Sequence, residues 1–293
     1  WAAGNGSSFR ATPPPTKYEK FSIDLSEWFM PIKNQGETSA CATFAGAAIM
    51  EYLINRKLNK KLDEVDLTKI LSELFLWYEI RPEKHLNIGV YRLETAPLFM
   101  REKGVCFDSI WSWLPIDKQT LLPTKFATKP TEEAYIDAFK KHIQNWRRLS
   151  VYDPDSWVKE LENGNPILIG IRVEPSLDVV GKAKRNLYIP EPSLVGGGHA
   201  VVIVGFTTDF PNPNPQDPNK TFPAFKIRNS SGSEWGENGY IWIPYLMLPT
   251  ILTEQPYVVE WKYEELKREP KALLTAGIVE IEELKIEPIE AEA

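Results

Sequence analysis

The sequence predicts an α+β protein in which a mainly helical lobe packs against a mainly β lobe. Up to about residue 150, apolar residues recur at the spacing of amphipathic helices. After that point, short runs of β-branched and aromatic residues are bounded by Gly, Asn and Pro, which is typical of antiparallel strands. The chain has 293 residues, of which 43% are hydrophobic and ten are Trp, so it can bury a large core.

The helical half follows an N-terminal arm, predicted at 1–20 because its Gly-, Ser- and Pro-rich start has no periodicity. A helix is predicted to begin at Cys41. Phe44, Ala48 and Tyr52 recur along it at helical spacing and give it an apolar face. The helical lobe is expected to cover 21–150, with further helices within 63–80, 94–104 and 131–146.

The β half is expected at 151–250. Its strands are predicted within 166–173, 199–206, 224–230 and 239–245. A long connector at 176–197 and a Pro- and Asn-rich loop at 211–223 interrupt them. Residues 251–293 are predicted to form a C-terminal extension, an edge strand followed by an acidic tail, because apolar and acidic residues alternate there; a partner-binding tail is the alternative.

Composition argues against several classes of protein. The net charge is -6, and both signs of charge are interspersed, so nucleic acid is not expected as a partner. No stretch approaches the roughly 18 consecutive apolar residues of a membrane-spanning helix, so no membrane partner is expected. The two cysteines, Cys41 and Cys106, are too few for a disulfide scaffold or a structural metal site.

Cys41 is a candidate nucleophile because it stands at the predicted start of a helix. A thiol attacks a carbonyl group as its thiolate, and the positive end of a helix lowers the thiol pKa below its free value of about 8.5. The alternative is that Cys41 is a small buried apolar residue, which is also what we expect of Cys106.

His199 is a candidate base for that thiol. It follows three glycines and precedes the apolar run AVVIVGF, predicted to be a buried strand. Such a strand would hold the imidazole rigidly at the boundary between the lobes, and Gly198 would let a substrate backbone approach closely. The alternative is a structural histidine at a strand edge.

Asn229 and Gln35 could complete such a site. Asn229 ends a predicted strand, where its amide oxygen could accept a hydrogen bond from one imidazole nitrogen and leave the other facing sulfur. Gln35 lies six residues before Cys41, and its amide could bind an oxyanion together with the Cys41 backbone N–H. The alternatives are a turn-forming Asn and a loop Gln without a role.

Three segments of the sequence carry a resemblance to a known family. PIKNQGETSACATFA, GGGHAVVIVGF and IRNSSGSEWGENGYIWI resemble the cysteine, histidine and asparagine segments of the papain family of cysteine peptidases. The order Gln, Cys, His, Asn is the same. The similarity extends from about Phe21 to Leu248 and includes the middle of the helical lobe as it is in bacterial and archaeal members.

The resemblance implies a papain-like two-lobed fold, with a helical lobe, an antiparallel β-barrel-like lobe and the active cleft between them. It implies that Cys41 is the nucleophile, His199 the general base and acid, Asn229 the residue that orients the imidazole, and Gln35 the oxyanion donor. The implied function is a cysteine endopeptidase that cleaves peptide or protein substrates through a thioester, without a metal or organic cofactor.

Four residues are candidates for substrate binding. Gly89 is similar to one of the two family glycines that bind the substrate backbone, although the match is offset by a residue or two. Tyr91 could form a wall of the pocket for the substrate's second side chain, with a packed aromatic as the alternative. Gly198 lies beside the predicted base. Trp235 is retained from the family pattern and could shield one side of the histidine–asparagine bond.

The sequence departs from the family pattern at three positions near these residues. Thr38 stands where most secreted members have a disulfide cysteine, which favours an intracellular over a secreted protein. Ala42 and Ser231 each stand where the family usually has Trp. Loss of the second Trp is expected to expose the bond between His199 and Asn229 and to weaken it.

Two alternatives to an endopeptidase remain open. A papain-fold protein without activity could serve as a binding module, and the replacements of Trp at 42 and 231 are the reason to consider it. A transpeptidase or exopeptidase would use the same thioester, and the insertion at 211–223 could overhang the cleft and restrict access.

Overall fold

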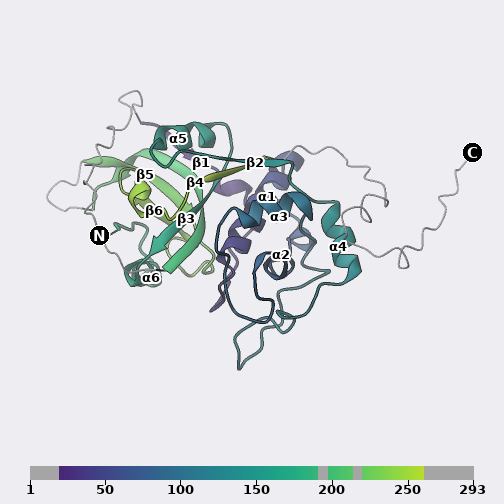
Figure 1. The fold of residues 1–293 in the computed structure, drawn as a ribbon. Helices are drawn as coiled ribbons and strands as arrows, with labels where there is room; N and C mark the ends of the chain where they lie inside the picture. The colour runs from purple at the N-terminus through teal and green to yellow at the C-terminus, as the bar shows by residue number, and fades with distance from the viewer. Residues whose placement is uncertain (1–19, 191–196, 214–219, 261–293) are drawn as a thin grey trace, which may run out of the picture.

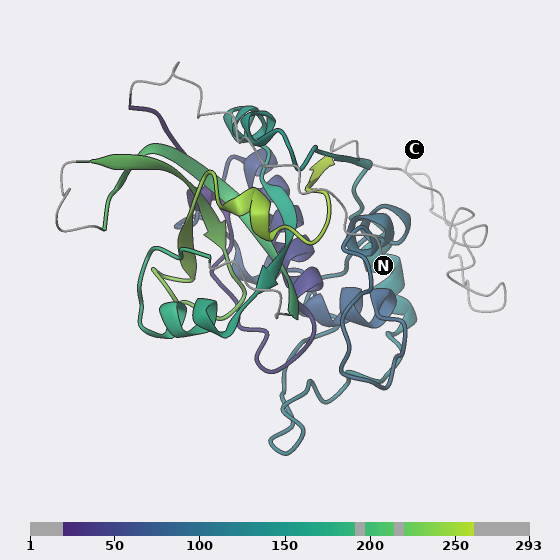
Figure 2. The ribbon, with the colours of Figure 1, turned by 60° about the vertical axis from the view of Figure 1, so that its left-hand side comes forward.

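The structure is a computed structural model that describes residues 20–190, 197–213 and 220–260. Four helices lie together on one side of the molecule and a seven-stranded antiparallel sheet lies on the other (Figures 1 and 2). The predicted α+β architecture, with helices mainly in the first half and strands mainly in the second, is confirmed.

The helical lobe contains α1 to α4. Helix α1 begins at Cys41, as predicted, and nearly all of its first three turns is buried because it runs between β4 and helices α2 and α3. Side-chain caps fix two further starts: Ser72 accepts from the Phe75 N–H before α2, and Thr131 accepts from the Ala134 N–H before α4. The helices are α1 (Cys41–Leu58), α2 (Glu73–Ile80), α3 (Thr95–Glu102) and α4 (Glu132–Phe139).

Several helix predictions need correction. The helix predicted at 131–146 ends at Phe139, and Asn145–Arg148 is strand β2, which pairs with β7 (Tyr257–Glu260). Pairing with a segment more than a hundred residues away outweighs the local helical periodicity. Helices α5 (Pro154–Glu162) and α6 (Pro175–Lys182) were not predicted, and α6 lies largely in the stretch expected to be an irregular connector.

The sheet has the strand order β2-β7-β3-β4-β5-β6, and β1 also pairs with β4. Strand β4 is the longest; β5 lies along one of its edges, and β3 and then β1 lie along the other. The remaining strands are β1 (Ser22–Asp24), β3 (Ile167–Val173), β4 (Gly197–Pro211), β5 (Thr221–Arg228) and β6 (Tyr240–Pro244).

The sheet draws on more of the chain than the predicted β half. Strands β1 and β2 come from the stretch assigned to the helical lobe. Strand β7 comes from the C-terminal extension but lies between β2 and β3, so it is not an edge strand: both of its sides are paired. The predicted acidic tail lies at 261–293, outside the described residues. Within the described ranges, no helix combines the length and apolarity needed to cross a membrane.

One core joins the two lobes. Its largest cluster combines the buried face of α1 with the apolar side chains of β3, β4, β5 and β6. A second cluster lies inside the helical lobe around Trp77, Trp111 and Trp113. Helix α1 packs directly against β4, and Cys41 at the start of the helix lies beside His199 and Ala200 near the start of the strand.

Candidate active site

The thiol of Cys41 lies at the N-terminus of α1, where backbone N–H groups lack intrahelical acceptors. The preceding residue, Ala40, offers no side chain to cap the helix. Instead, the backbone N–H groups of Ala42 and of Ala200 on β4 lie near the sulfur and help to lower the pKa of the thiol. The partial positive charge at the N-terminus of α1 therefore acts on the Cys41 thiol.

The imidazole of His199 comes from the start of β4. Pairing with Ile171 of β3 fixes the backbone at this residue, so the ring projects from a rigid strand. One ring nitrogen, Nε2, lies 2.8 Å from Oδ1 of Asn229. The ring also interacts with the Cys41 thiol, and because Nε2 is already used by Asn229, Nδ1 is the nitrogen that remains for the sulfur.

Asn229 follows directly after β5, and its side chain is buried. Its Oδ1 accepts from the Ser230 N–H at 2.9 Å, which identifies the oxygen end of the amide. Because Oδ1 can only accept, Nε2 of His199 must carry the proton in this contact. The Asn229 amide therefore favours the forms of the imidazole that are protonated on Nε2. In these forms Nδ1 is the ring nitrogen that faces sulfur.

The two groups shift each other's pKa in opposite directions. Burial on its own would raise the pKa of the Cys41 thiol, but the hydrogen bond and charge of His199, with the two backbone N–H groups, lower it below its usual value. Burial on its own would lower the pKa of His199, but its bonds to Cys41 and Asn229 raise it. Both shifts favour a thiolate beside an imidazolium.

Gln35 lies in the loop before α1 and is held from both ends. Its Oε1 accepts from the Ser230 hydroxyl at 2.6 Å, and its Nε2 donates to the Thr38 carbonyl oxygen at 2.7 Å. An amide nitrogen has two hydrogens, so one donor of Gln35 remains for a ligand beside the Cys41 N–H. Ser230 was missed from the sequence; only its place next to Asn229 could have pointed to it.

A cleft of about 950 Å³ opens beside these groups and is lined by both lobes. Its walls include Cys41, His199 and Gln35, together with three of the predicted substrate-binding residues: Gly89, Tyr91 and Gly198. Tyr91 is 86% exposed, so it is not the packed core aromatic of the alternative prediction. The structure does not bring Trp235 to this cleft: its indole is buried against Gly181 of α6.

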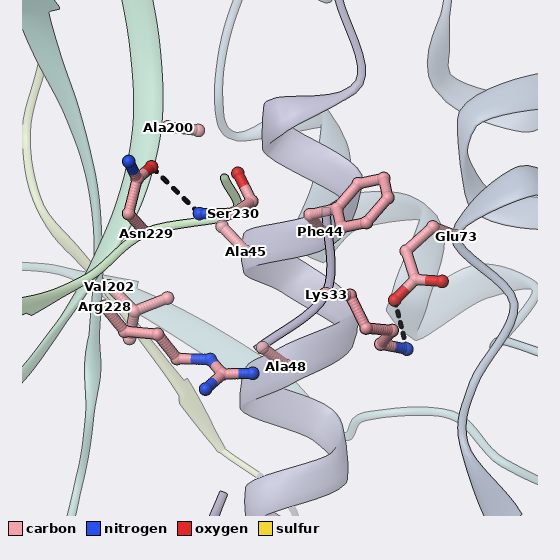
Figure 3. A pocket seen from close by; sticks show the side chains of 10 residues that line it. All are labelled: Lys33, Phe44, Ala45, Ala48, Glu73, Ala200, Val202, Arg228, Asn229 and Ser230. Carbon is pink, nitrogen blue, oxygen red and sulfur yellow. Dashed lines mark hydrogen bonds and ion pairs between the residues drawn. The ribbon is translucent and has the colours of Figure 1, made fainter. Parts of the chain in front are cut away.

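Behind Asn229, a small cavity of about 10 Å³ lies between α1, β4 and the end of β5. It has room for about one water molecule. Figure 3 shows Asn229 and Ser230 on one side of this cavity and the ion pair of Lys33 with Glu73 on the other. Lys33 Nζ also lies 3.0 Å from Oε1 of Glu51. The cluster thus places two buried carboxylates beside one partly exposed ammonium group.

Glu73 is fully buried in this cluster. Burial raises the pKa of its carboxyl group to about 7; the nearby charge of Glu51 adds to the rise, and Lys33 opposes it. The pKa of Lys33 is raised, because its two carboxylate partners outweigh the effect of burial. The cluster was not singled out from the sequence, since its three members are distant along the chain.

A helical lobe and an antiparallel sheet, with a thiol, an imidazole and an amide aligned at the cleft between them, define the papain-like class of proteins. The comparisons with known proteins agree with this class. Residues 111–247 match the family described as papain family cysteine protease. Over that segment the chain is similar to the papain family of cysteine proteases, and it shares the fold of solved members.

Solved structures share the fold. Xylellain, a cysteine protease from Xylella fastidiosa, is 25% identical with a TM-score of 0.66, and the match covers 90% of this chain and 92% of that one. Digestive procathepsin L 3 of Tenebrio molitor is 16% identical with a TM-score of 0.60, covering 85% and 73% of the two chains. The bromelain protease from Ananas comosus, in complex with the E64 inhibitor, is 19% identical with a TM-score of 0.56, covering 82% and 99%.

A viral relative is also similar. An uncharacterised peptidase C1-like protein of Acanthamoeba polyphaga mimivirus is 26% identical over 226 residues. The aligned region covers 72% of this chain and 63% of the viral protein, so the chain spans less than two thirds of that relative's length.

Proposed function

We propose that the protein is a cysteine endopeptidase that hydrolyses peptide bonds through a thioester on Cys41. The observation that carries the proposal is the alignment in which His199 interacts with the Cys41 thiol and is hydrogen-bonded to Asn229. Opposite pKa shifts in the thiol and the imidazole favour the nucleophilic form of sulfur. Similarity to the papain family over residues 111–247 and the open cleft support a peptide or protein substrate.

The first half of the reaction forms the thioester. The Cys41 thiolate attacks the carbonyl carbon of the scissile peptide bond, and the carbonyl oxygen becomes an oxyanion. The free donor of Gln35 and the Cys41 backbone N–H stabilise that charge. When the tetrahedral intermediate collapses, the carbon–nitrogen bond breaks, and Nδ1 of His199 gives its proton to the leaving amine.

The second half releases the acid product. A water molecule loses a proton to the now neutral His199 and attacks the thioester carbon. The new tetrahedral intermediate expels the thiolate, which leaves a carboxylic acid and restores the thiolate–imidazolium pair. Asn229 accepts from Nε2 throughout, so it keeps Nδ1 directed at the reacting atoms.

Hydrolysis of fluorogenic peptides under reducing conditions tests this function. Wild-type protein is expected to cleave them, and the E64 inhibitor that binds the bromelain relative is expected to stop cleavage. Cys41→Ala is expected to abolish hydrolysis because it removes the nucleophile. Cys106→Ala is the matched control, since it removes a buried thiol away from the cleft and should keep activity. Full activity of Cys41→Ala would exclude the proposal.

The same assay can separate an endopeptidase from an exopeptidase. A peptide blocked at both ends leaves no terminus for an exopeptidase to recognise, so an endopeptidase cleaves it internally. The masses of the products identify the bond that was cut. Products that are joined to an added amine would instead indicate acyl transfer from the thioester.

A further inference from the structure

Ser231, which stands where the family usually has Trp, makes a direct contact with Asn229. Its hydroxyl oxygen lies 3.1 Å from Nδ2 of that residue and accepts a hydrogen bond from it. Oδ1 of the same amide accepts from His199 and from the Ser230 N–H. Both ends of the buried Asn229 amide therefore have partners. The oxygen accepts from His199 and from the Ser230 N–H, and the nitrogen donates to Ser231.

The backbone of this segment is tied to the loop that precedes Cys41. Asn34 and Ser231 form an isolated antiparallel bridge. The Gln35 N–H donates to the Ser230 carbonyl oxygen at 2.9 Å, and the Gly232 N–H donates to the Lys33 carbonyl oxygen at 3.2 Å. Ser231 is consequently held in place by main-chain bonds, and its hydroxyl has a fixed location next to the amide.

We propose that Ser231 is a positioning residue for the His199–Asn229 pair, which rests on the proposed function of this site. The Ser231 hydroxyl, which is hydrogen-bonded to Nδ2 of Asn229, takes the place of the Trp side chain that the family usually has at this position. Without it, Nδ2 of Asn229 would be a buried donor lacking this acceptor. The amide would then turn towards other partners, and Oδ1 would accept less often from His199.

The consequence reaches the imidazole. The bond to Asn229 is one of the interactions that raise the pKa of His199, so weakening it lowers that pKa. The imidazolium would lose its proton at lower pH, and the alkaline limb of the activity profile would move in the same direction. Substrate binding should not change, because Ser231 is not among the residues that line the cleft in the described part of the chain.

Two substitutions of equal shape isolate the hydroxyl. Ser231→Thr keeps it and Ser231→Val lacks it, so any difference between them comes from the hydrogen bond and not from size. Ser231→Val is expected to lower kcat about three- to tenfold with KM unchanged, and to shift the alkaline limb to lower pH. Ser231→Thr should retain the wild-type profile. Ser233→Ala, an exposed residue of the same loop, is the control for general effects of mutation here.

A second measurement does not depend on hydrolysis. The chain has three histidines, so ring-labelled protein gives few signals, and NMR titration can follow His199 directly. Its pKa is expected to fall in Ser231→Val and to stay at the wild-type value in Ser231→Thr. If peptides are not hydrolysed, the proposed function fails while this titration still tests the positioning. Equal His199 pKa values, or equal pH profiles, in the Thr and Val variants would overturn the inference.

Discussion

The indole of Trp235 lies against the α-carbon of Gly181. A Cβ built at position 181 would be 1.9 Å from Cε2 of the ring, far closer than real carbon atoms approach. The Gly236 N–H also donates to the Gly181 carbonyl oxygen at 2.8 Å. Helix α6 is thereby fastened to the loop that carries Asn229 and Ser231, and Trp235 acts in packing at this point.

Gly181→Ala is expected to destabilise the protein by about 2 kcal/mol or more, because the new methyl group must displace the indole. This is the reverse of the usual preference, since Ala in a helix interior is favoured over Gly by about 1 kcal/mol. Urea unfolding in a Cys41→Ala background, which prevents self-cleavage, measures the difference. Val179→Ala on the exposed side of the same helix is the control and should change stability by less than about 0.5 kcal/mol. A stabilised Gly181→Ala would show that the packing is looser than in the structure.

The spacing of apolar residues was sufficient to predict a helix or a strand where the local segment determines its own secondary structure. Apolar spacing located α1, and it did so with the correct first residue, which is what places the thiol at a helix terminus. The run after Gly198 forms strand β4 as predicted. The candidate site could be assembled because each of its four residues lies in a long segment resembling a known family.

Pairing between distant segments could not be predicted from these signals. Strand β2 is a strand because β7 lies beside it, and nothing in the sequence around 145–148 specifies that partner. The same limit applies to the site. Ser231 was expected only to leave the histidine–asparagine bond exposed; that its hydroxyl meets the Asn229 amide depends on the backbone conformation after β5.

The buried carboxyl group of Glu73 predicts a stability that declines from acid to neutral pH. Its pKa is raised to about 7 in the folded protein, against about 4.5 for an unperturbed Glu. Between these values the folded state holds a proton that the unfolded state has released, so the free energy of unfolding falls as pH rises. The full contribution is present below pH 4.5 and amounts to roughly 3 kcal/mol.

Glu73→Gln removes this titration and keeps the shape of the side chain. Urea unfolding of Cys41→Ala and of the double variant Cys41→Ala/Glu73→Gln, at several pH values from 5 to 8, compares their slopes. The variant that retains Glu73 is expected to lose stability more steeply with pH. Parallel slopes would mean that Glu73 is ionised throughout the range in the folded protein, with Lys33 outweighing the effects of burial and of Glu51.

Gly198 is expected to be required for activity and not for stability. Nothing in the described structure lies within 4 Å of a Cβ built there, so Gly198→Ala should change the free energy of unfolding by less than about 0.5 kcal/mol. The residue lines the cleft beside His199, so its methyl group would occupy space for substrate and lower kcat/KM about tenfold or more. Gly197→Ala is the matched control: it also meets open space but does not line the cleft, and it should keep activity.

The two cysteines are expected to differ strongly in their reaction with iodoacetamide. The pKa of Cys41 is lowered and its side chain is partly exposed, whereas burial, with the charge of Asp137, raises the pKa of the fully buried Cys106 to about 12. Since the thiolate is the reacting form, labelling at pH 6.5 should modify Cys41 alone, and peptide masses identify the site. In urea both thiols should react at similar rates, because unfolding removes the contacts that separate their pKa values. Equal labelling in the folded protein would mean that the helix start and His199 do not activate the thiol.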